Sequence, residues 1–309
     1  MTVKEELTRI KKRNNILKTI EQFSEENNLI KVEVDDFERY DHFMQNNPQF
    51  DMRTFVKVQD LSGNMLLLKP DITTNIIAQV TKMIDQDESL ALYYLDNVYS
   101  YNGNNDIAVT RQYGVELLGN DVNNNELTLI KTLETLFDTF NLPLVIELGN
   151  QAFVNVLLDN LDVPTETLKT IKTLIMNKNL PELKTILKTS TKTSYKTLLI
   201  DLFEKDTHGY ELLHWIQKMN LDVRLAVELK SLLDIKAKAK DTVVIDLTLM
   251  HQYNYYNGPI FKGYTDNIKT DILRGGRYDT LTKTYGQPTK ALGFSLDMDT
   301  FIEEVTLND

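Results

Sequence analysis

The sequence predicts an α+β fold in which helices pack on an antiparallel sheet, and three observations lead to this prediction. Two pairs of apolar segments flank short turn-forming stretches, as the strands of β-hairpins do. Before and after these pairs, apolar residues recur at helical spacing. Between residues 151 and 240 the composition changes, because Gly209 is the only glycine and Leu, Lys and Thr dominate. We therefore expect a core of sheet and helices that is interrupted by a helical insertion.

Each element expected in the first half of the chain has a local signal. Apolar residues spaced three and four apart indicate helices, and Asp71 is placed to cap the one that opens at Pro70. Stretches rich in Gly and Asn separate the strands of each hairpin. In chain order we expect helix 5–26, strand 30–34, a hairpin of 55–59 with 65–68, helix 70–84, a hairpin of 90–101 with 107–118, helix 125–140 and strand 144–148.

The second half begins with the insertion, where Leu168, Ile171 and Ile175 recur at helical spacing. Strand character returns after the Ala237–Lys240 run. The core is thus expected to consist of residues 1–150 and 241–309, and the helical insertion of residues 151–240. The elements expected after the insertion are strands 243–249, 255–264, 271–275 and 291–296 and a helix over 297–305.

Composition excludes several classes of function. The net charge of the 309 residues is −11, and nucleic-acid binding as the main role needs clustered Lys and Arg instead. The chain has no cysteine and its four histidines lie far apart, so we expect no disulfide, no metal and no cofactor. The N-terminus is charged and no apolar run is long enough to span a bilayer. We expect a cytoplasmic protein that does not bind membranes.

Two motifs near the C-terminal end resemble the histidyl-tRNA synthetase family. They read H-Q-Y-N-Y-Y-N-G at 251–258 and R-G-G-R-Y-D at 274–279, where that family has R-G-L-D-Y-Y-T-G and G-G-G-R-Y-D. His251 stands in place of the arginine beside the reacting carboxylate, and Asn254 in place of the aspartate. The resemblance therefore implies a substrate-shaped pocket that is kept while catalytic charges are removed.

Four more segments extend the resemblance over nearly the whole chain: F-E-R-Y-D-H-F at 37–43, L-K-P-D-I-T at 68–73, T-R-Q-Y-G-V-E at 110–116 and A-L-G-F-S-L-D-M-D-T at 291–300. The synthetases write L-R-P-E-G-T at the second of these. The synthetase-like regulatory subunits of ATP phosphoribosyltransferase write L-R-P-D-M-T, which the Asp71 form favours. An ammonium group needs anionic and hydroxyl acceptors, and Asp71 and Thr73 of this segment can supply them. The histidine-binding residues that the resemblance implies are Asp71, Thr73, Gln112, Glu116, Tyr255 and Tyr256.

The same comparison implies three lost catalytic positions, which are Ser100, His251 and Thr300. In the synthetases they hold arginines that contact the substrate carboxylate or the ATP phosphates. A serine hydroxyl cannot supply the planar charged fork that a phosphate accepts. Loss of a single preorganised donor lowers the reaction rate by about 10²–10³, so any aminoacyl-adenylate formation should be far slower than in a working synthetase. We therefore expect no catalytic residue in this chain.

The resemblance implies a class II synthetase-like core and the role of a non-catalytic regulatory subunit. Such a subunit is required for activity of the short-form ATP phosphoribosyltransferase catalytic subunit and for histidine feedback inhibition of the first step of histidine biosynthesis. The resemblance also implies a hetero-octamer with that catalytic subunit and a self-dimer through the N-terminal helix and the segment near Phe37–Phe43. In the family the dimer-forming motif normally ends in proline, whereas this chain has Asp35 there. No anticodon-binding domain is expected.

Two other interpretations remain open. One is a divergent histidyl-tRNA synthetase or its catalytic fragment, which histidine-dependent pyrophosphate exchange would reveal. The other is a scaffold without a ligand, which would not gain thermal stability from free histidine.

Overall fold

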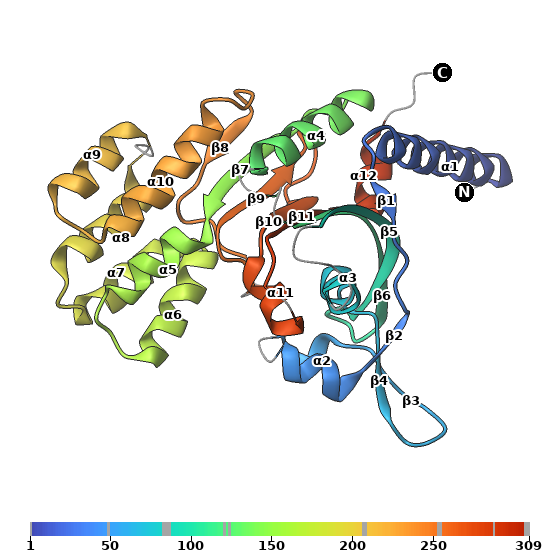
Figure 1. Ribbon diagram of the computed structural model, residues 1–309, viewed down its shortest axis with the longest axis horizontal. Helices are drawn as coiled ribbons and strands as arrows, with labels where there is room; N and C mark the ends of the chain where they lie inside the picture. The colour runs from blue at the N-terminus through green and yellow to red at the C-terminus, as the bar shows by residue number, and fades with distance from the viewer. Residues whose placement is uncertain are drawn as a thin grey trace. The chain divides into compact units, whose positions relative to one another are not determined.

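The computed structural model describes residues 2–47, 50–81, 88–119, 122, 125–205, 209–251, 255–286 and 288–305. The chain divides into two compact units. The first unit comprises Met1–Leu144 and Tyr264–Asp309, and the second comprises Val145–Gly263. The fold class is confirmed, because each unit combines helices with β-strands in the manner of an α+β protein (Figure 1). The domain boundaries at 150 and 241 stay a prediction.

The main sheet of the first unit is built around one long hairpin. Its strands β5 and β6 pair antiparallel from Ser89↔Gly119 to Tyr101↔Ile107, and β11 and β10 continue the antiparallel sheet on the β6 side. The opposite edge differs from the predicted all-antiparallel pairing, because β1 lies parallel to β5. The chain leaves β1 and returns to β5 through a crossover, which places the two strands in the same direction. In spatial order the strands are β1 (Ile30–Lys31), β5 (Ser89–Tyr101), β6 (Ile107–Gly119), β11 (Ala291–Asp297) and β10 (Leu273–Arg277).

A smaller sheet in the same unit carries the segment that leads to Asp71. Phe43, Phe55 and Leu67 are buried together beside it, and the rings of Phe43 and Phe55 meet edge to face at 5.3 Å between centroids. The predicted hairpin of residues 55–59 and 65–68 is confirmed in this sheet. Its elements are β2 (Phe37–Arg39), β4 (Met65–Leu68) and β3 (Lys57–Gln59), accompanied by α2 (Tyr40–Asn46) and the 3₁₀ turn η1 (Met52–Thr54).

Helices α1, α4 and α12 of the first unit lie within two residues of their predicted bounds, whereas α3 ends at Val80, before the predicted residue 84, and α11 was not predicted. Thr2 and Glu5 form a capping box at the start of α1, and Ile16, Ile20 and Phe23 are its buried apolar residues. In Figure 1 the blue helix α1 lies beside the red helix α12. The helices of this unit are α1 (Val3–Glu26), α3 (Ile72–Val80), α4 (Glu126–Thr139), α11 (Asp279–Tyr285) and α12 (Met298–Glu304).

The second unit is mainly helical, as the composition of residues 151–240 predicts. Strands β7 and β8 are parallel, because the helices between them carry the chain back across their sheet. Asn150 ends β7 and caps α5 by accepting hydrogen bonds from the backbone N–H groups of Ala152 and Phe153. The elements are β7 (Val145–Asn150), α5 (Gln151–Asp159), α6 (Thr165–Met176), α7 (Leu180–Ile186), η3 (Leu187–Thr189), α8 (Thr193–Glu204), α9 (Tyr210–Lys218), α10 (Val223–Lys236), β8 (Val243–Ile245) and β9 (Pro259–Tyr264).

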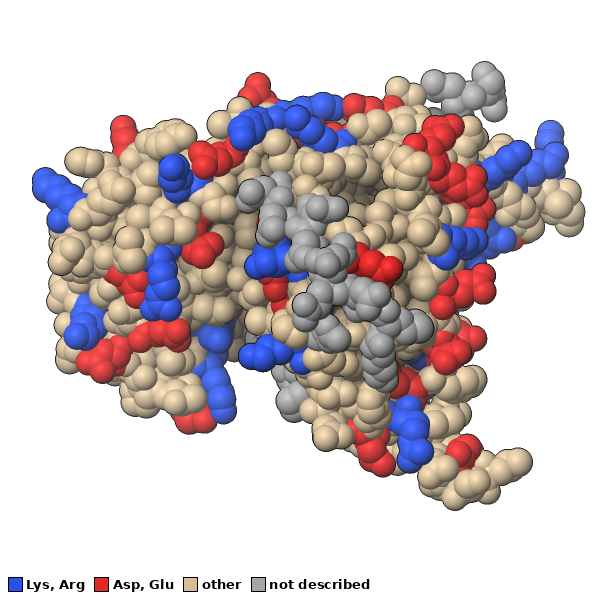
Figure 2. Space-filling view, in the orientation of Figure 1, with Lys and Arg blue, Asp and Glu red and all other residues tan. Residues whose placement is uncertain are grey.

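Two broad surface properties bear on function. Among the described residues, no helix is both long and apolar enough to cross a membrane. On the face drawn in Figure 2, Lys and Arg side chains alternate with Asp and Glu and do not gather into one basic surface. A mixed surface of this kind gives no electrostatic support for phosphate-backbone binding.

Candidate functional site

The centre of the candidate site is Glu116, a buried carboxylate on β6. Its side chain is 1% exposed, and its strand neighbour across the sheet is Gly293 on β11. A Cβ at Gly293 would overlap the Glu116 carboxylate and would lie 2.6 Å from the backbone oxygen of Val115. The glycine therefore leaves the space that this carboxylate occupies.

Two hydroxyl groups donate hydrogen bonds to Glu116. Thr73 Oγ1 donates to Glu116 Oε1 at 2.6 Å, and the phenol of Tyr278 donates to Oε2. Thr73 is placed by the N-terminus of α3, where Asp71 caps the helix by accepting a hydrogen bond from the Thr74 N–H at 2.7 Å. The first turn of α3, a central strand and the N-cap residue of α11 thus meet at one carboxylate.

Burial changes the acidity of three carboxyl groups in this part of the first unit. It raises the pKa of Glu116 to about 8, and the Asp71 carboxylate acts in the same direction. Burial also raises the pKa of Asp71 itself. The pKa of Glu38 rises to about 7 through burial and the proximity of Asp71. Carboxylates grouped in this way favour either a bound proton or a cationic ligand.

Lys69 fixes the segment that carries Asp71. Its side chain is fully buried, and its Nζ lies 2.5 Å from Asp96 Oδ2 on β5 and 3.2 Å from Asp36 Oδ1. The backbone N–H of Lys69 also donates to the backbone carbonyl oxygen of Asp36 at 2.8 Å. A buried cation with two carboxylates anchors this turn against the main sheet, directly before Pro70.

The structure brings together some of the residues predicted to bind histidine. Thr73 and Glu116 are in direct contact, and Asp71 influences the acidity of Glu116. Gln112 lies on the same face of β6 as Glu116, about 13 Å further along the strand. Gly114 lies between them, and a Cβ there would overlap the Tyr94 ring.

Tyr255 and Tyr256 belong to the second unit. Their rings are 4.7 Å apart, and the ring of His251 lies 4.6 Å from that of Tyr256. All three side chains are buried. These contacts form an aromatic cluster, and a shared role with Glu116 in holding one ligand stays a prediction.

The positions predicted to have lost catalytic arginines have ordinary structural environments. Ser100 is exposed near the tip of the long hairpin, opposite Ala108. The Thr300 N–H donates to Asp297 Oδ1 at 3.0 Å as part of the cap of α12. Asn254 lies outside the described residues. The register of β10 and β11 places Arg274 on the sheet face that carries Glu116, where it forms an ion pair with Asp271.

Four contributors to this site were not predicted as site residues. Tyr278 is the tyrosine of the R-G-G-R-Y-D motif, so the motif itself was the signal that could have identified it. Gly293 and Lys69 also lie inside the matched motifs. Glu38 also lies inside a matched motif, F-E-R-Y-D-H-F, but only folding places it near Asp71. In the described part of the chain, no cluster of His, Asp and Glu could hold a metal ion.

Comparison with known proteins decides the family. The family model for histidyl-tRNA synthetase matches residues 7–301. An ATP phosphoribosyltransferase regulatory subunit from Clostridium novyi is 30% identical over 292 residues, which cover 87% of this chain and 67% of the relative. The chain belongs to the histidyl-tRNA synthetase family, among the ATP phosphoribosyltransferase regulatory subunits. A regulatory subunit from Clostridium botulinum is 31% identical and is covered to 65%, so the chain spans about two thirds of these relatives.

Solved structures support the fold of this regulatory-subunit family member. An ATP phosphoribosyltransferase regulatory subunit/histidyl-tRNA synthetase from Bacillus halodurans gives a TM-score of 0.83 at 22% identity, over 97% of this chain and 80% of that one. A chain of the ATP phosphoribosyl transferase (HisG:HisZ) complex from Thermotoga maritima gives a TM-score of 0.68 at 20% identity, over 91% and 96%. The resemblance of the motifs to this family is thus confirmed by the matches over most of the chain.

Proposed function

We propose that this protein is the regulatory subunit that the short-form catalytic subunit of ATP phosphoribosyltransferase requires for activity, and that it has no catalytic activity of its own. The observation that carries the proposal is the intact contact between Thr73 and Glu116 beside Asp71, together with the absence of arginine at Ser100 and Thr300. Groups suited to a cationic ligand are present, whereas neutral side chains stand at the two positions where the synthetases carry the charged forks that hold a reacting phosphate. Such a fold acts through a partner.

The proposed ligand is histidine, which would make the subunit the sensor for feedback inhibition. Asp71 and Glu116 match an ammonium and an imidazole group, and the hydroxyl groups of Thr73 and Tyr278 complete the polar shell around Glu116. Gln112, Tyr255 and Tyr256 belong to the proposed set through the resemblance. Histidine regulates the complex if it binds the inactive assembly more tightly than the active one.

The proposed assembly is a hetero-octamer that contains self-dimers of this chain. Val3 and Leu7 are exposed apolar residues four positions apart on α1, at 79% and 53% exposure. Ile30 and Phe37 are also exposed large apolar side chains of the first unit. An exposed apolar set of this kind supports self-association through the N-terminal helix and the segment that starts at Phe37. No nucleic-acid or membrane partner is proposed, and a cytoplasmic location stays a prediction.

The alternative function is that of a divergent histidyl-tRNA synthetase or its catalytic fragment. The family model supports this alternative, because it carries the synthetase name. Histidine-dependent exchange of pyrophosphate into ATP separates the two. Exchange at the rate of a working synthetase would establish the enzyme, whereas the regulatory role predicts none.

The deciding experiment mixes this chain with a short-form catalytic subunit and measures phosphoribosyl transfer from phosphoribosyl pyrophosphate to ATP. Activity should appear in the mixture and should fall when histidine is added. Thr73→Val should keep the activation and weaken the inhibition by histidine at least about fivefold, because it removes a hydroxyl donor from Glu116. Thr135→Val on the exposed face of α4 is the matched control. An inactive mixture that shows no heteromeric complex on gel filtration would refute the proposal.

A further inference from the structure

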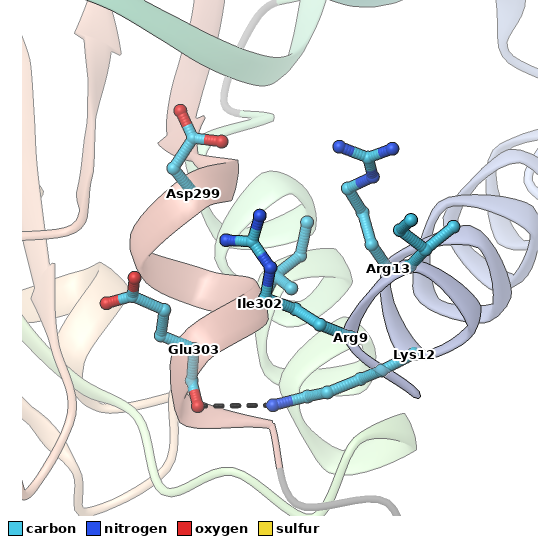
Figure 3. A pocket seen from close by; sticks show the side chains of 7 residues that line it. Arg9, Lys12, Arg13, Asp299, Ile302 and Glu303 are labelled. Carbon is cyan, nitrogen blue, oxygen red and sulfur yellow. Dashed lines mark hydrogen bonds between the residues drawn. The ribbon is translucent and has the colours of Figure 1, made fainter. Parts of the chain in front are cut away.

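A hollow of about 460 Å³ lies between helices α1 and α12 of the first unit. It is lined by Arg9, Ile10, Lys12, Arg13, Asp299, Ile302 and Glu303. Figure 3 shows Arg9, Lys12 and Arg13 on α1 and Asp299, Ile302 and Glu303 on α12, with Lys12 reaching the backbone oxygen of Glu303. The volume falls within the range of small-molecule sites, whereas contacts between proteins are flatter.

The hollow exists because the inward face of α1 changes character along the helix. Ile16 and Ile20 are fully buried, and they follow Arg9 at the spacings of seven and eleven that return to the same helical face. Toward the N-terminus this face therefore presents Arg9 and Arg13 to α12 instead of apolar side chains. Val3 and Leu7 lie on another face, so the self-contact proposed above does not compete for these arginines.

Opposite charges face each other across this space without pairing. Arg9 and Arg13 are four residues apart on α1, and Asp299 and Glu303 are four residues apart on α12. Within the described part of the chain, no ion pair closer than 4.0 Å joins these arginines to these carboxylates. The two rows of charge are thus held apart by the fold.

Several contacts hold the rims in place. Glu6 accepts hydrogen bonds from Arg9 Nε at 3.2 Å and Nη2 at 3.1 Å, which fixes the plane of the guanidinium and leaves its other N–H groups to the hollow. Lys12 Nζ donates to the backbone oxygen of Glu303 at 3.2 Å and ties the two helices together. The Arg111 N–H donates to Asp299 Oδ2 at 3.0 Å.

We infer that this hollow binds a free α-amino acid with an apolar side chain. A carboxylate matches the planar donor fork of an arginine on the α1 side, and an ammonium matches the carboxylates on the α12 side. Ile10 and Ile302 supply the apolar contact for the side chain. A simple anion would leave the Glu303 carboxylate unmatched, and a simple cation would leave the Arg13 guanidinium unmatched, whereas Arg9 already pairs with Glu6 and Asp299 accepts from the Arg111 N–H. The site contains neither Asp71 nor Glu116, and the inference does not depend on the proposed histidine site.

The test is an NMR titration of the full-length ¹⁵N-labelled chain, followed at the backbone amides of α1 and α12. L-Leucine is the probe. Isopentylamine is the same molecule without the carboxylate, and 4-methylpentanoate is the same molecule without the ammonium. Leucine should shift the α1 and α12 amides in a saturable way, with binding at least about fivefold tighter than for either analogue. Added salt should weaken the binding, because the charges are exposed.

Substitutions test the same inference from the side of the protein. Arg13→Gln and Glu303→Gln should each weaken leucine binding at least about fivefold. Arg224→Gln and Glu166→Gln, at exposed positions of the second unit, should leave it unchanged. Thr73→Val should also leave it unchanged, which separates this site from the proposed histidine site.

Four results would overturn the inference. Equal binding of 4-methylpentanoate or inorganic phosphate would show a general anion site, and equal binding of isopentylamine would show a general cation site. Full leucine binding by Arg13→Gln would place the ligand elsewhere. The last result combines two measurements: leucine shifts no amide of the wild type, and Arg13→Gln or Glu303→Gln changes the oligomeric state on gel filtration. Together they would show that the hollow receives a second copy of the chain.

Discussion

Replacing Glu116 by glutamine tests the electrostatics of the candidate site through stability. Glu116 is 1% exposed, and burial raises its pKa from an ordinary value of 4.5 to about 8 in the folded protein. Between these two pH values the folded protein keeps a proton that the unfolded chain has released. The free energy of unfolding therefore falls as the pH rises, by up to about 1.4 kcal/mol for each pH unit.

The full effect is present below about pH 4.5 and is lost by about pH 8. Over that window it amounts to at most about 5 kcal/mol, which is comparable with the whole stability of many domains. Glutamine has nearly the same shape and no proton to lose, so Glu116→Gln should remove this part of the pH dependence. Glu38, with a pKa raised to about 7, contributes with the same sign in both proteins and cancels in the comparison.

The assay is urea unfolding followed by circular dichroism between about pH 5 and pH 8, at one protein concentration because self-association would also affect stability. The wild-type free energy of unfolding should decline across this range more steeply than that of Glu116→Gln, by about 1 kcal/mol per pH unit. Glu166→Gln, at an exposed position, should follow the wild type. Parallel curves for wild type and Glu116→Gln would refute the argument, because they would mean that Glu116 is ionised in the folded protein.

Two further substitutions test the packing around this site. Lys69→Met should lower the free energy of unfolding by about 3–5 kcal/mol, because it leaves the carboxylate of Asp96 without its buried cation. Lys169→Met on the surface is the control and should lower it by less than about 0.5 kcal/mol. Equal losses of the two variants in urea unfolding would contradict the anchoring role of Lys69. Gly293→Ala should cost about 1–3 kcal/mol by crowding the Glu116 carboxylate, whereas Gly103→Ala has open space around its Cβ and should be nearly neutral in thermal unfolding.

Local sequence signals predicted most of the elements, because each depends on residues close together in the chain. Helix α1 follows from apolar spacing and from the capping box at Thr2 and Glu5. The long hairpin follows from two strands separated by a short Asn- and Gly-rich turn. The parallel pairing of β1 with β5 could not be predicted in this way, since about sixty residues separate Ile30 from Leu92.

The candidate site was predictable only where its residues lie in recognisable motifs. Thr73 and Glu116 were predicted as members of one set, and they are in contact. The hydrogen bond from Tyr278 to Glu116 joins residues 162 positions apart, and no periodicity reports such a pair. The space that Gly293 leaves for Glu116 becomes apparent only when β6 and β11 are paired. Contacts between distant segments depend on the register of the sheet, which a single sequence does not reveal.

Under the proposed function, the balance of charge in the first unit would favour ligand binding over catalysis. Transfer to or from a phosphate needs positive groups that stabilise charge developing in the transition state. At Ser100 and Thr300 the chain offers neutral side chains, while Asp71 and Glu116 are buried carboxyl groups with raised pKa values, whose ionised form a cationic ligand would favour. A cationic ligand must displace the proton from Glu116, so its binding energy is coupled to a change in buried charge. Through that coupling, ligand binding can favour one arrangement of an assembly over another without any chemical step, as a regulatory subunit requires.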